Sequence, residues 1–329
     1  MIITIQKMLP VCAMVVAMGL AVPASAKQTG EVFISSEKDN LITVLDGKTQ
    51  QQIASIKVCK RPRHLQLTRD RQRLITVCGD DGLAIVIDVA SNKVVDTIKL
   101  QEGVEIFDLS PDGKKIYFSN EDEAAIVVLD LATRKVINQF KVGEEPEGVL
   151  VTPDGKTLYA TSEVANLVHV IDLASGKIVK NLEVGKRPRR FALTPDGKEL
   201  WVTCVLDASV SIIRTADQTV VGTIKFQLKG FRPDDINPVG IMIGSDGKTA
   251  FVALGRANHV ALVDVASRIV RNLILVGKRA WGVAVSRDNA TLYVANGLSD
   301  DVSVIDLASG RAVKTVKVGR LPHSVVIDD

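Results

Sequence analysis

Short runs of alternating apolar and polar residues recur along this chain of 329 residues. The last complete unit contains four such runs, Trp281–Asp288, Thr291–Asn296, Asp301–Asp306 and Ala312–Val318. Each run is rich in β-branched residues and is bounded by Gly, Asn, Asp or Pro, which is typical of short β-strands separated by turns. We therefore predict an all-β fold built from units of four strands, named A to D in chain order.

The units repeat at a nearly constant period. Strand C ends on an Asp in six of seven units, Arg214 occupies the same place in the other unit, and successive intervals are 42, 42, 42, 42, 50 and 42 residues. The six aspartates are Asp46, Asp88, Asp130, Asp172, Asp264 and Asp306. A period of about 40–45 residues with several short strands is typical of a propeller blade. We predict a seven-bladed β-propeller of four-stranded blades.

The repeated Asp has a structural interpretation. It stands at the turn between strands C and D, as in Asp172–Lys177 and Asp306–Arg311. An Asp side chain in such a turn accepts hydrogen bonds from the backbone that follows it. In the unit that carries Arg214, Asp217 is available for the same turn. We interpret the repeated Asp as a turn-capping residue and not as a catalytic one.

The two ends of the repeat array are complementary. The first unit offers only strands B, C and D, at Glu31–Ser36, Leu41–Asp46 and Gln52–Val58, whereas the chain closes with a lone A-type strand, Ser324–Asp328. We expect this last strand to join the first three in one blade. The ring would then be closed by hydrogen bonds and would leave only short, protected sheet edges.

The first 26 residues have the pattern of a cleavable signal peptide. Lys7 precedes the apolar stretch Val11–Val22, and Ala24–Ala26 forms an A-x-A cleavage site. The apolar stretch is shorter than the roughly 20 residues that span a bilayer. We expect residues 27–329 to form one exported, monomeric domain in the periplasm, without a membrane anchor. Loss of Lys7 lowers the formal net charge from +3 to +2, which argues against general attraction to nucleic acid.

Two segments carry a resemblance to a known repeat family. Leu292–Asn296 and Leu158–Ser162, within units that read Val-Ile-Asp and Pro-Asp-Gly-Lys, resemble the YVTN family of β-propeller repeats over residues 31–329. The exported seven-repeat form and the segment Phe231–Pro238 are similar to the PQQ-dependent catabolism-associated β-propeller proteins. That resemblance implies an association with quinoprotein alcohol oxidation and implies no particular activity.

Charged residues gather in the connections that precede strand A, and in a propeller these D–A loops lie around the channel mouth. Lys60–His64 and Lys186–Arg190 are near-copies that are 126 residues apart. The basic candidates for ligand binding and their neighbours are Lys60, Arg61, Arg63, His64, Lys186, Arg187, Arg189, Arg190, Arg279, Trp281, Arg320 and His323. An acidic sector consists of Glu102, Glu105, Glu144, Glu145 and Glu147. Arg suits carboxylate or phosphate recognition, but neighbouring loops of opposite charge also form solvated ion pairs worth about 0–1 kcal/mol.

The single break in the repeat is an insertion of eight residues within 227–237, on the same face. Phe231 gives it an apolar tip, and Arg232, Asp234 and Asp235 flank that tip with both charges. Departures from a uniform scaffold are places where function concentrates. A specific contact and a structural plug over the channel are both open interpretations.

Motifs for cofactor or metal chemistry are missing from the sequence. The histidines of the mature chain show no metal-ligand spacing, and there is no nucleophile elbow or nucleotide-binding glycine loop. We expect no catalytic residues, no metal and no cofactor. Cys59 and Cys78 belong to one blade and are candidates for a disulfide in an oxidising compartment, whereas Cys78 and Cys204 face each other across the hub.

Three functions are compatible with these observations. The first is a non-catalytic binding or scaffold protein that serves PQQ-dependent alcohol catabolism and holds a small acid or a periplasmic protein partner at the basic mouth. The second is a lactonase-type hydrolase, since some seven-bladed propellers are lactonases. The third is a propeller that binds single-stranded nucleic acid, but Trp281 and Phe231 are the only aromatic residues expected near the mouth for base stacking.

Overall fold

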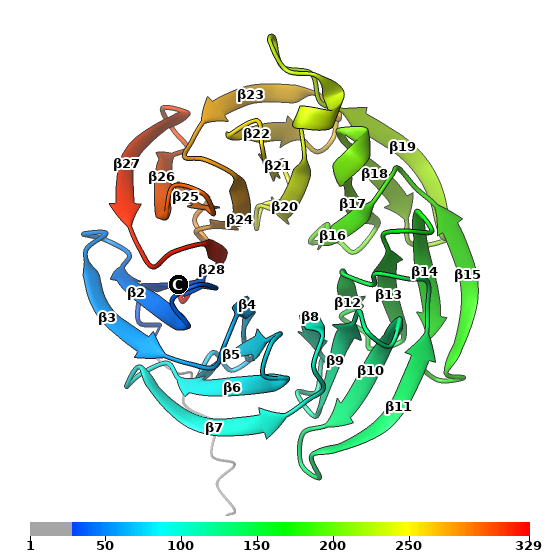
Figure 1. Cartoon of the computed structure of the whole chain (residues 1–329). Helices are drawn as coiled ribbons and strands as arrows, with labels where there is room; N and C mark the ends of the chain where they lie inside the picture. Colours follow the sequence, from blue (N-terminus) through cyan, green and yellow to red (C-terminus); the bar gives the residue numbers. More distant parts are fainter. Residues whose placement is uncertain (1–27) are drawn as a thin grey trace, which may run out of the picture.

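The computed structural model describes residues 28–329. The signal peptide predicted over residues 1–26 and its cleavage site after Ala26 lie outside the described residues. Within residues 28–329, seven antiparallel sheets of four strands surround a central channel (Figure 1). This arrangement confirms the predicted seven-bladed β-propeller. No helix among the described residues is long and apolar enough to cross a membrane.

The first four blades follow one strand order from the channel outward, A to D. Blade 1 is β28 (Pro322–Ile327), β1 (Glu31–Ser36), β2 (Leu41–Asp46) and β3 (Gln52–Lys57). Blade 2 is β4 (Pro62–Leu67), β5 (Arg73–Cys78), β6 (Leu83–Asp88) and β7 (Lys93–Lys99). Blade 3 is β8 (Val104–Leu109), β9 (Lys115–Asn120), β10 (Ala125–Asp130) and β11 (Lys135–Lys141). Blade 4 is β12 (Val149–Val151), β13 (Thr157–Ser162), β14 (Leu167–Asp172) and β15 (Lys177–Glu183).

The remaining three blades keep the same order. Blade 5 is β16 (Pro188–Leu193), β17 (Glu199–Cys204), β18 (Ser209–Arg214) and β19 (Thr219–Lys225). Blade 6 is β20 (Pro238–Ile243), β21 (Thr249–Leu254), β22 (His259–Asp264) and β23 (Val270–Leu275). Blade 7 is β24 (Ala280–Val285), β25 (Thr291–Asn296), β26 (Asp301–Asp306) and β27 (Arg311–Lys317). Two short 3₁₀ helices, η1 (Val205–Asp207) and η2 (Pro233–Asp235), follow β17 and β19.

The last strand closes the ring, as predicted. β28 pairs antiparallel with β1, with Phe33 opposite Val326. The N–H group of Gly30 donates to the carbonyl oxygen of Asp328 at 2.7 Å, and the Asp328 carboxylate accepts from the Thr29 hydroxyl at 2.8 Å. Strands from the two ends of the described chain therefore share one sheet.

The apolar faces of the blades pack against each other around the ring. Strands B and C are almost fully buried, whereas strand D alternates between exposed and buried residues. Trp201, Tyr159 and Tyr293 are the largest side chains in this core, and each is at most 2% exposed. Because every blade packs between two others, the core is a continuous circular layer around the channel.

The six repeated aspartates cap the turn between strands C and D. In each blade one carboxylate oxygen accepts the backbone N–H of the residue three positions later, for example Ser175 N–H to Asp172 at 2.7 Å and Ser309 N–H to Asp306 at 2.7 Å. The same bond forms at Asp46, Asp88, Asp130 and Asp264. Arg214 instead pairs with Asp217 at 2.6 Å. These contacts account for the repeated Asp as turn structure.

The insertion after β19 does not cover the channel. The yellow-green segment at the top of Figure 1 reaches outward beyond the rim of the ring. The Phe231 ring is 38% exposed and packs edge-on against His259, with the two ring centroids 6.2 Å apart. Arg232 is exposed and pairs with Asp235 within the insertion at 3.3 Å. The plug interpretation is therefore wrong.

Cys59 and Cys78 form a disulfide across 19 residues in blade 2. It links the connection before β4 to the end of β5, and both cysteines pack in a hydrophobic core cluster. Cys204 is buried and has no disulfide partner among residues 28–329.

Candidate functional site

One repeat position, within strand A or, at Glu147, just before it, supplies a ring of seven side chains around the channel. Successive blades contribute residues spaced by 42 or, across the insertion, 50 positions. We call this set the channel ring; it consists of Arg63, Glu105, Glu147, Arg189, Val239, Trp281 and His323. Blades 2 to 5 therefore present charged side chains, whereas blades 6, 7 and 1 present Val, Trp and His.

The charged half of the channel ring is a buried ion-pair network. Arg63 contacts the Glu105 carboxylate and lies 3.6 Å from that of Glu147. Glu147 is fully buried and accepts a hydrogen bond from Arg190 at 2.8 Å. Arg189 lies 3.8 Å from Glu147. One carboxylate thus serves three guanidinium groups, and such shared pairing is what allows charges to remain buried.

Burial and mutual repulsion separate the pKa values of the acidic side chains. Burial raises the pKa of Glu147, but Arg189, Arg190 and Arg63 outweigh burial and lower this pKa to about 2. Burial and the neighbouring Glu147 charge raise the pKa of Glu105 to about 8. Burial likewise raises the pKa of Glu163, which contacts Arg189, to about 7. Glu147 is therefore the residue that holds the negative charge at the centre of the network.

Three arginines precede strand A in the sequence, each directly before the proline or alanine with which that strand begins. Arg61, Arg187 and Arg279 all have φ between 57° and 59°, a left-handed conformation that the short connection imposes. Arg61 pairs with Glu105 at 2.9 Å, and Arg187 pairs with Glu163 at 2.6 Å. Arg279 forms no ion pair with any residue of the described chain and stacks on Trp281, 4.3 Å from the ring centroid.

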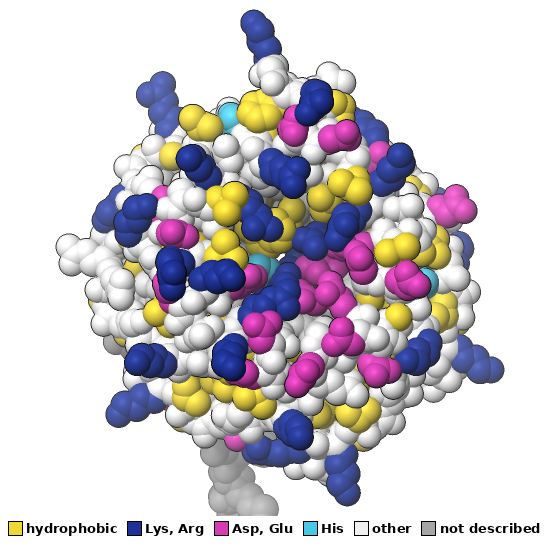
Figure 2. Space-filling view, viewed as in Figure 1, with side chains coloured by type: hydrophobic (Ala, Val, Ile, Leu, Met, Phe, Trp, Pro, Cys, Tyr) yellow, Lys and Arg dark blue, Asp and Glu magenta, His cyan; other side chains and the backbone are white. Residues whose placement is uncertain are grey.

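A cavity of about 480 Å³ opens at the mouth between blades 5, 6 and 7. We call it the mouth pocket. Its polar and charged lining is Arg187, Arg189, Arg256, Arg279, Asp234 and Asn237, and Trp281 forms part of its wall. Figure 2 shows Lys and Arg side chains around the hollow on this face, with Asp and Glu gathered on one side of it. The mouth thus has one sector in which arginines pair with acidic side chains and another sector that is basic.

The basic sector is uncompensated at Arg279 and Arg256. Within residues 28–329, neither guanidinium has a carboxylate within ion-pair distance, whereas Arg187 and Arg189 both do. Burial lowers the pKa of Arg279, and the neighbouring charges of Arg189 and Arg256 lower it further, outweighing Glu37. A group with negative charge in the mouth pocket would relieve this repulsion.

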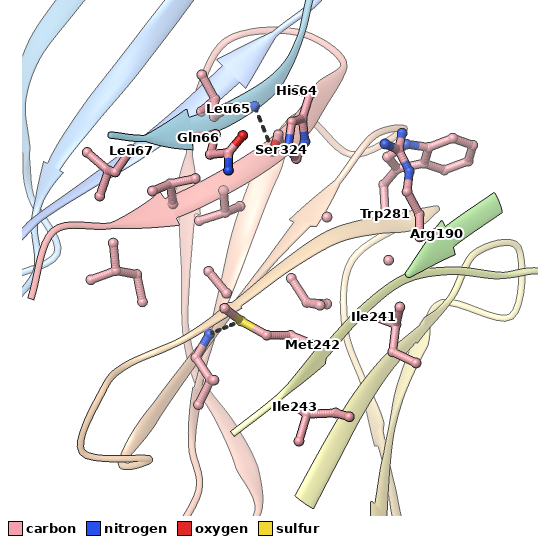
Figure 3. A pocket seen from close by; sticks show the side chains of 18 of the residues that line it. His64, Leu65, Gln66, Leu67, Arg190, Ile241, Met242, Ile243, Trp281 and Ser324 are labelled. Atoms are coloured by element: carbon pink, nitrogen blue, oxygen red, sulfur yellow. Dashed lines mark hydrogen bonds between the residues drawn. The ribbon is translucent and has the colours of Figure 1, made fainter. Parts of the chain in front are cut away.

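A larger cavity of about 590 Å³ lies beneath the channel ring, and we call it the channel cavity. It is lined by strands β4, β20, β24 and β28 and by the start of β16. In Figure 3, Arg190 and Trp281 lie together at one end, and Ile241, Met242 and Ile243 lie along the wall. Its upper end is polar and its walls are apolar.

The structure brings only part of the predicted site together. Arg61, Arg63, Arg187, Arg189, Arg190, Glu105, Glu145 and Glu147 join the ion-pair network, and Arg279, Trp281 and His323 lie beside it. His64 lies lower than expected and faces the channel cavity. The others point from exposed loops: Lys60 faces Asp81, Arg320 pairs with Asp39, and Lys186, Arg232, Glu102 and Glu144 are exposed. The expectation of a solvated mouth is wrong for Glu105 and Glu147, which are at most 1% exposed.

Sequence reasoning missed the contribution of the B–C connections. Glu37, Glu121 and Glu163 occupy one repeat position, the residue after strand B, at intervals of 84 and 42. Glu37 lies 3.8 Å from Arg63, and Glu163 contacts Arg187 and Arg189. Arg256 follows strand B of blade 6. Alignment of the repeats at this position provides the signal that identifies the three glutamates, whereas Arg256 lies one residue beyond it.

Three of the acidic groups lie close together. Glu105, Glu121 and Glu147 each place a carboxylate oxygen within 4.8 Å of the others. Guanidinium groups already occupy the space around two of these carboxylates, at Glu105 from Arg61 and Arg63 and at Glu147 from Arg190. The cluster is therefore organised by arginines, and we assign no cation to it.

Comparison with solved structures supports the fold. Hydrazine synthase of Kuenenia stuttgartiensis is similar with a TM-score of 0.76 and 23% identity over 85% of this chain and 93% of that one. A functionally unknown protein of Desulfotomaculum acetoxidans matches with a TM-score of 0.77 and 16% identity over 91% and 98%. The periplasmic gluconolactonase PpgL of Pseudomonas aeruginosa matches with a TM-score of 0.76 and 19% identity over 91% and 99%. At these identities the likeness shows the β-propeller fold alone.

Family membership rests on the sequence. None of the curated proteins matches this chain. Residues 31–295, which include all of blades 2 to 6, match the family described as "Choice-of-anchor I domain". A domain of this kind indicates an extracellular or exported protein. The chain belongs to the choice-of-anchor I domain family.

Proposed function

We propose that this protein is a non-catalytic, periplasmic binding component of PQQ-dependent alcohol catabolism that holds an acidic segment of a partner protein in the mouth pocket. The observation that carries the proposal is the pair Arg256 and Arg279, which face a cavity of about 480 Å³ without a carboxylate partner in the described chain. Guanidinium groups in such a cavity suit a carboxylate, because each presents a planar set of donors.

Exposed apolar residues around the mouth pocket support a protein partner. Leu206 and Leu298 are 48% and 60% exposed and line the pocket. Val164, on the B–C connection of blade 4, is 55% exposed on the same face. Apolar side chains beside unpaired arginines offer both the contact area and the charge that interfaces use.

The insertion connects the mouth pocket with the resemblance to the PQQ-associated propellers. Its residues 231–238 carry that resemblance, and Asp234 and Asn237 from the same segment line the mouth pocket. Asn237 is held in place by hydrogen bonds from its side-chain amide to the carbonyl oxygens of Val205 and Asp234, at 3.4 and 3.3 Å. The insertion, which interrupts the regular repeat, therefore contributes residues to the pocket that we assign to binding.

Intrinsic fluorescence provides a direct test. Of the two tryptophans, Trp201 is fully buried and Trp281 lies in the mouth between Arg279 and Arg189. We expect a hexaglutamate peptide to change Trp281 emission saturably, with an affinity that falls as salt rises. The double variant Arg256→Ala/Arg279→Ala should weaken binding at least about tenfold, since a charged hydrogen bond contributes about 1.5–3 kcal/mol. Citrate serves as a small acid for comparison.

The matched control removes two cations from the outer strand of blade 7, Arg311→Ala/Lys314→Ala. This variant has the same net charge as the mouth variant, and we expect it to bind the peptide like the unmodified protein. Equal weakening in both variants would show that binding follows net charge, and equal affinity of all three proteins would show that the mouth arginines do not contribute. Either result would contradict the mouth assignment. Tighter binding of citrate than of the peptide would point to a small acid instead of a protein partner.

The lactonase and the nucleic-acid interpretations can each be tested by a separate measurement. Hydrolysis of gluconolactone by the purified protein would favour the lactonase interpretation, to which the likeness to PpgL adds only the shared fold. Binding of oligothymidylate that quenches Trp281 and persists in moderate salt would favour single-stranded nucleic acid, because base stacking on an aromatic ring is less sensitive to salt than charge pairing.

A further inference from the structure

The channel cavity adjoins the mouth pocket at Val239 and Trp281, which line both, but it differs from the mouth pocket in chemistry. Its volume of about 590 Å³ falls within the range of about 300–1,000 Å³ that is usual for small-molecule sites. Apolar side chains from four A strands form the walls, among them Leu67, Ile241, Ile243, Val285 and Ile327. Met242 is 38% exposed in a strand that lines the channel. These walls offer an extended contact surface to an apolar ligand.

The upper end of the channel cavity presents a cation with unused donors. Arg190 donates from Nη2 to Glu147 and lies 3.4 Å from Nε2 of His323. Its Nε and Nη1 groups donate to no other residue within 28–329, and its side chain lines the cavity. Glu147 is shared with Arg63 and Arg189, so Arg190 keeps part of its charge uncompensated. Burial and the charges of Arg63 and Arg189 lower the pKa of Arg190 to about 10.

His64 lines the same cavity and lies close enough to Arg190 for the guanidinium charge to affect its pKa. Its ring packs edge-on against Phe107, with centroids 5.2 Å apart, and its nitrogens bond to no residue of the described chain. Burial and the Arg190 charge lower the pKa of His64 to about 3, so the imidazole is neutral at physiological pH. A neutral imidazole supplies one N–H donor.

At the lower end of the channel cavity, Arg71 already has partners within the protein. Arg71 donates to the Asp328 carboxylate at 2.8 Å and to the carbonyl oxygen of Ile327 at 2.7 Å. Gln66, between the two ends, donates to Asp108 at 2.7 Å. The unused donors of the lining therefore include those of Arg190 and His64 together with the buried Trp281 Nε1, and Gln66 Oε1 and His323 Nδ1 are also buried without a partner; the exposed Arg287 lies at the opposite rim.

We propose that the channel cavity binds a monocarboxylate with an apolar body, the carboxylate at Arg190 and His64 and the body along Ile241, Met242 and Val285. The guanidinium supplies a charged N–H donor to the carboxylate and the imidazole supplies a second donor. The apolar body replaces water along the walls, which favours binding in proportion to the area buried. This site shares no ligand-contacting residue with the Arg256 and Arg279 pair and does not depend on the function proposed for the mouth.

Octanoate is the probe, and Met242 is a specific reporter. The chain has five methionines, four of which lie in residues 1–26, so the mature protein has one. We expect octanoate to shift the ¹³C-methyl resonance of Met242, assigned with Met242→Leu, and to bind saturably by calorimetry. Octanol, which lacks the charge, should bind at least about tenfold more weakly. Acetate, which lacks the apolar body, should bind at least about a hundredfold more weakly than octanoate.

Two variants test the two ends of the site. Arg190→Gln should weaken octanoate binding at least about tenfold. Met242→Trp fills the cavity without touching the ion-pair network and should abolish binding, whereas Val313→Trp, at an outer position that is 61% exposed, should not. If Arg190→Gln does not fold, Met242→Trp and the octanol comparison still decide. The Arg256→Ala/Arg279→Ala protein should bind octanoate normally, which separates this site from the mouth pocket.

Three outcomes would overturn the proposal. The first is a Met242 resonance that does not move at saturating octanoate. The second is equal binding by the unmodified protein and Met242→Trp. The third is binding that survives Arg190→Gln but is lost in Arg287→Ala, which would place the carboxylate at the opposite rim.

Discussion

Two repeat positions of this propeller make a useful comparison. The end of strand C carries Asp in six of seven blades, and each carboxylate bonds the backbone of its own turn. The channel ring uses the same period but carries five residue types in seven blades. The first position meets the same local requirement, capping of the turn between strands C and D. The second position faces a shared space, so its residues differ according to their neighbours across the blades.

The difference predicts where substitutions are costly. Glu147→Ala removes the carboxylate shared by Arg63, Arg189 and Arg190 and leaves buried cations without compensation. We expect a loss of about 3–5 kcal/mol in the free energy of unfolding, measured by urea denaturation. Glu145→Ala is the control, because Glu145 pairs with Arg187 on the same side of the mouth but is 46% exposed, and its loss should cost at most about 1 kcal/mol. Equal effects would show that the network is no stronger than a surface pair.

Protonation of the network provides a second, smaller effect. Burial and Glu147 raise the pKa of Glu105 to about 8, so the folded state binds this proton more tightly than the unfolded state does. The stabilisation is complete below the unfolded-state pKa of about 4.3 and is lost as the pH rises through 8. Glu163 acts in the same direction, whereas the lowered pKa values of the buried His64 and His323 act in the opposite direction below about pH 6.5 and reduce the net fall. We expect the free energy of unfolding to fall by about 1–3 kcal/mol between pH 5 and pH 8.

The variant Glu105→Gln tests the source of this pH dependence. A neutral amide cannot ionise, so the fall in stability between pH 5 and pH 8 should become shallower. Glu183→Gln, at an exposed position of β15, is the control and should keep the original slope. A stability that rises over this range, together with strong destabilisation by Glu105→Gln at every pH, would mean that Glu105 is ionised in the folded protein.

The turn position should give the smallest effect. Asp172→Ala removes the hydrogen bond from Ser175 N–H and should cost about 1 kcal/mol in thermal or urea unfolding. Asp130→Ala should cost nearly the same, because its turn has the same geometry, with Thr133 N–H bonded at 2.7 Å. Neither change should affect the binding of hexaglutamate or octanoate. A turn variant that folds but loses either ligand would end the distinction between the two repeat positions.

The sequence predicted the fold and much less of the site, for a physical reason. Strand and turn preferences are local, so the pattern within each unit was enough to identify the blades, the capping Asp and the closing strand. The site depends on contacts between blades. Arg63 and Glu147 are 84 residues apart and Arg190 and His323 are 133 apart. Their pairing follows from closure of the ring and not from any local pattern.

The same limit explains the error about exposure. Glu105 and Glu147 follow charged or glycine-containing connections, so their sequence context indicated solvated loops. In the structure, Glu105 belongs to β8, and both carboxylates face arginines from other blades. The buried position of a carboxylate depends on the arginines that reach it, and those come from elsewhere in the chain. Aligning the blades position by position would have placed all four charged residues in one ring.

Closure of the ring by β28 also makes assembly of the channel depend on one strand pairing. His323, a member of the channel ring, lies on the last strand of the described chain, and its partner β1 is the first. Until β28 arrives, β1 has an unpaired edge that is open to association with other chains. The channel ring, the mouth and the channel cavity are then all incomplete. A chain in which β28 has not yet paired with β1 therefore lacks both a closed ring and a complete channel lining.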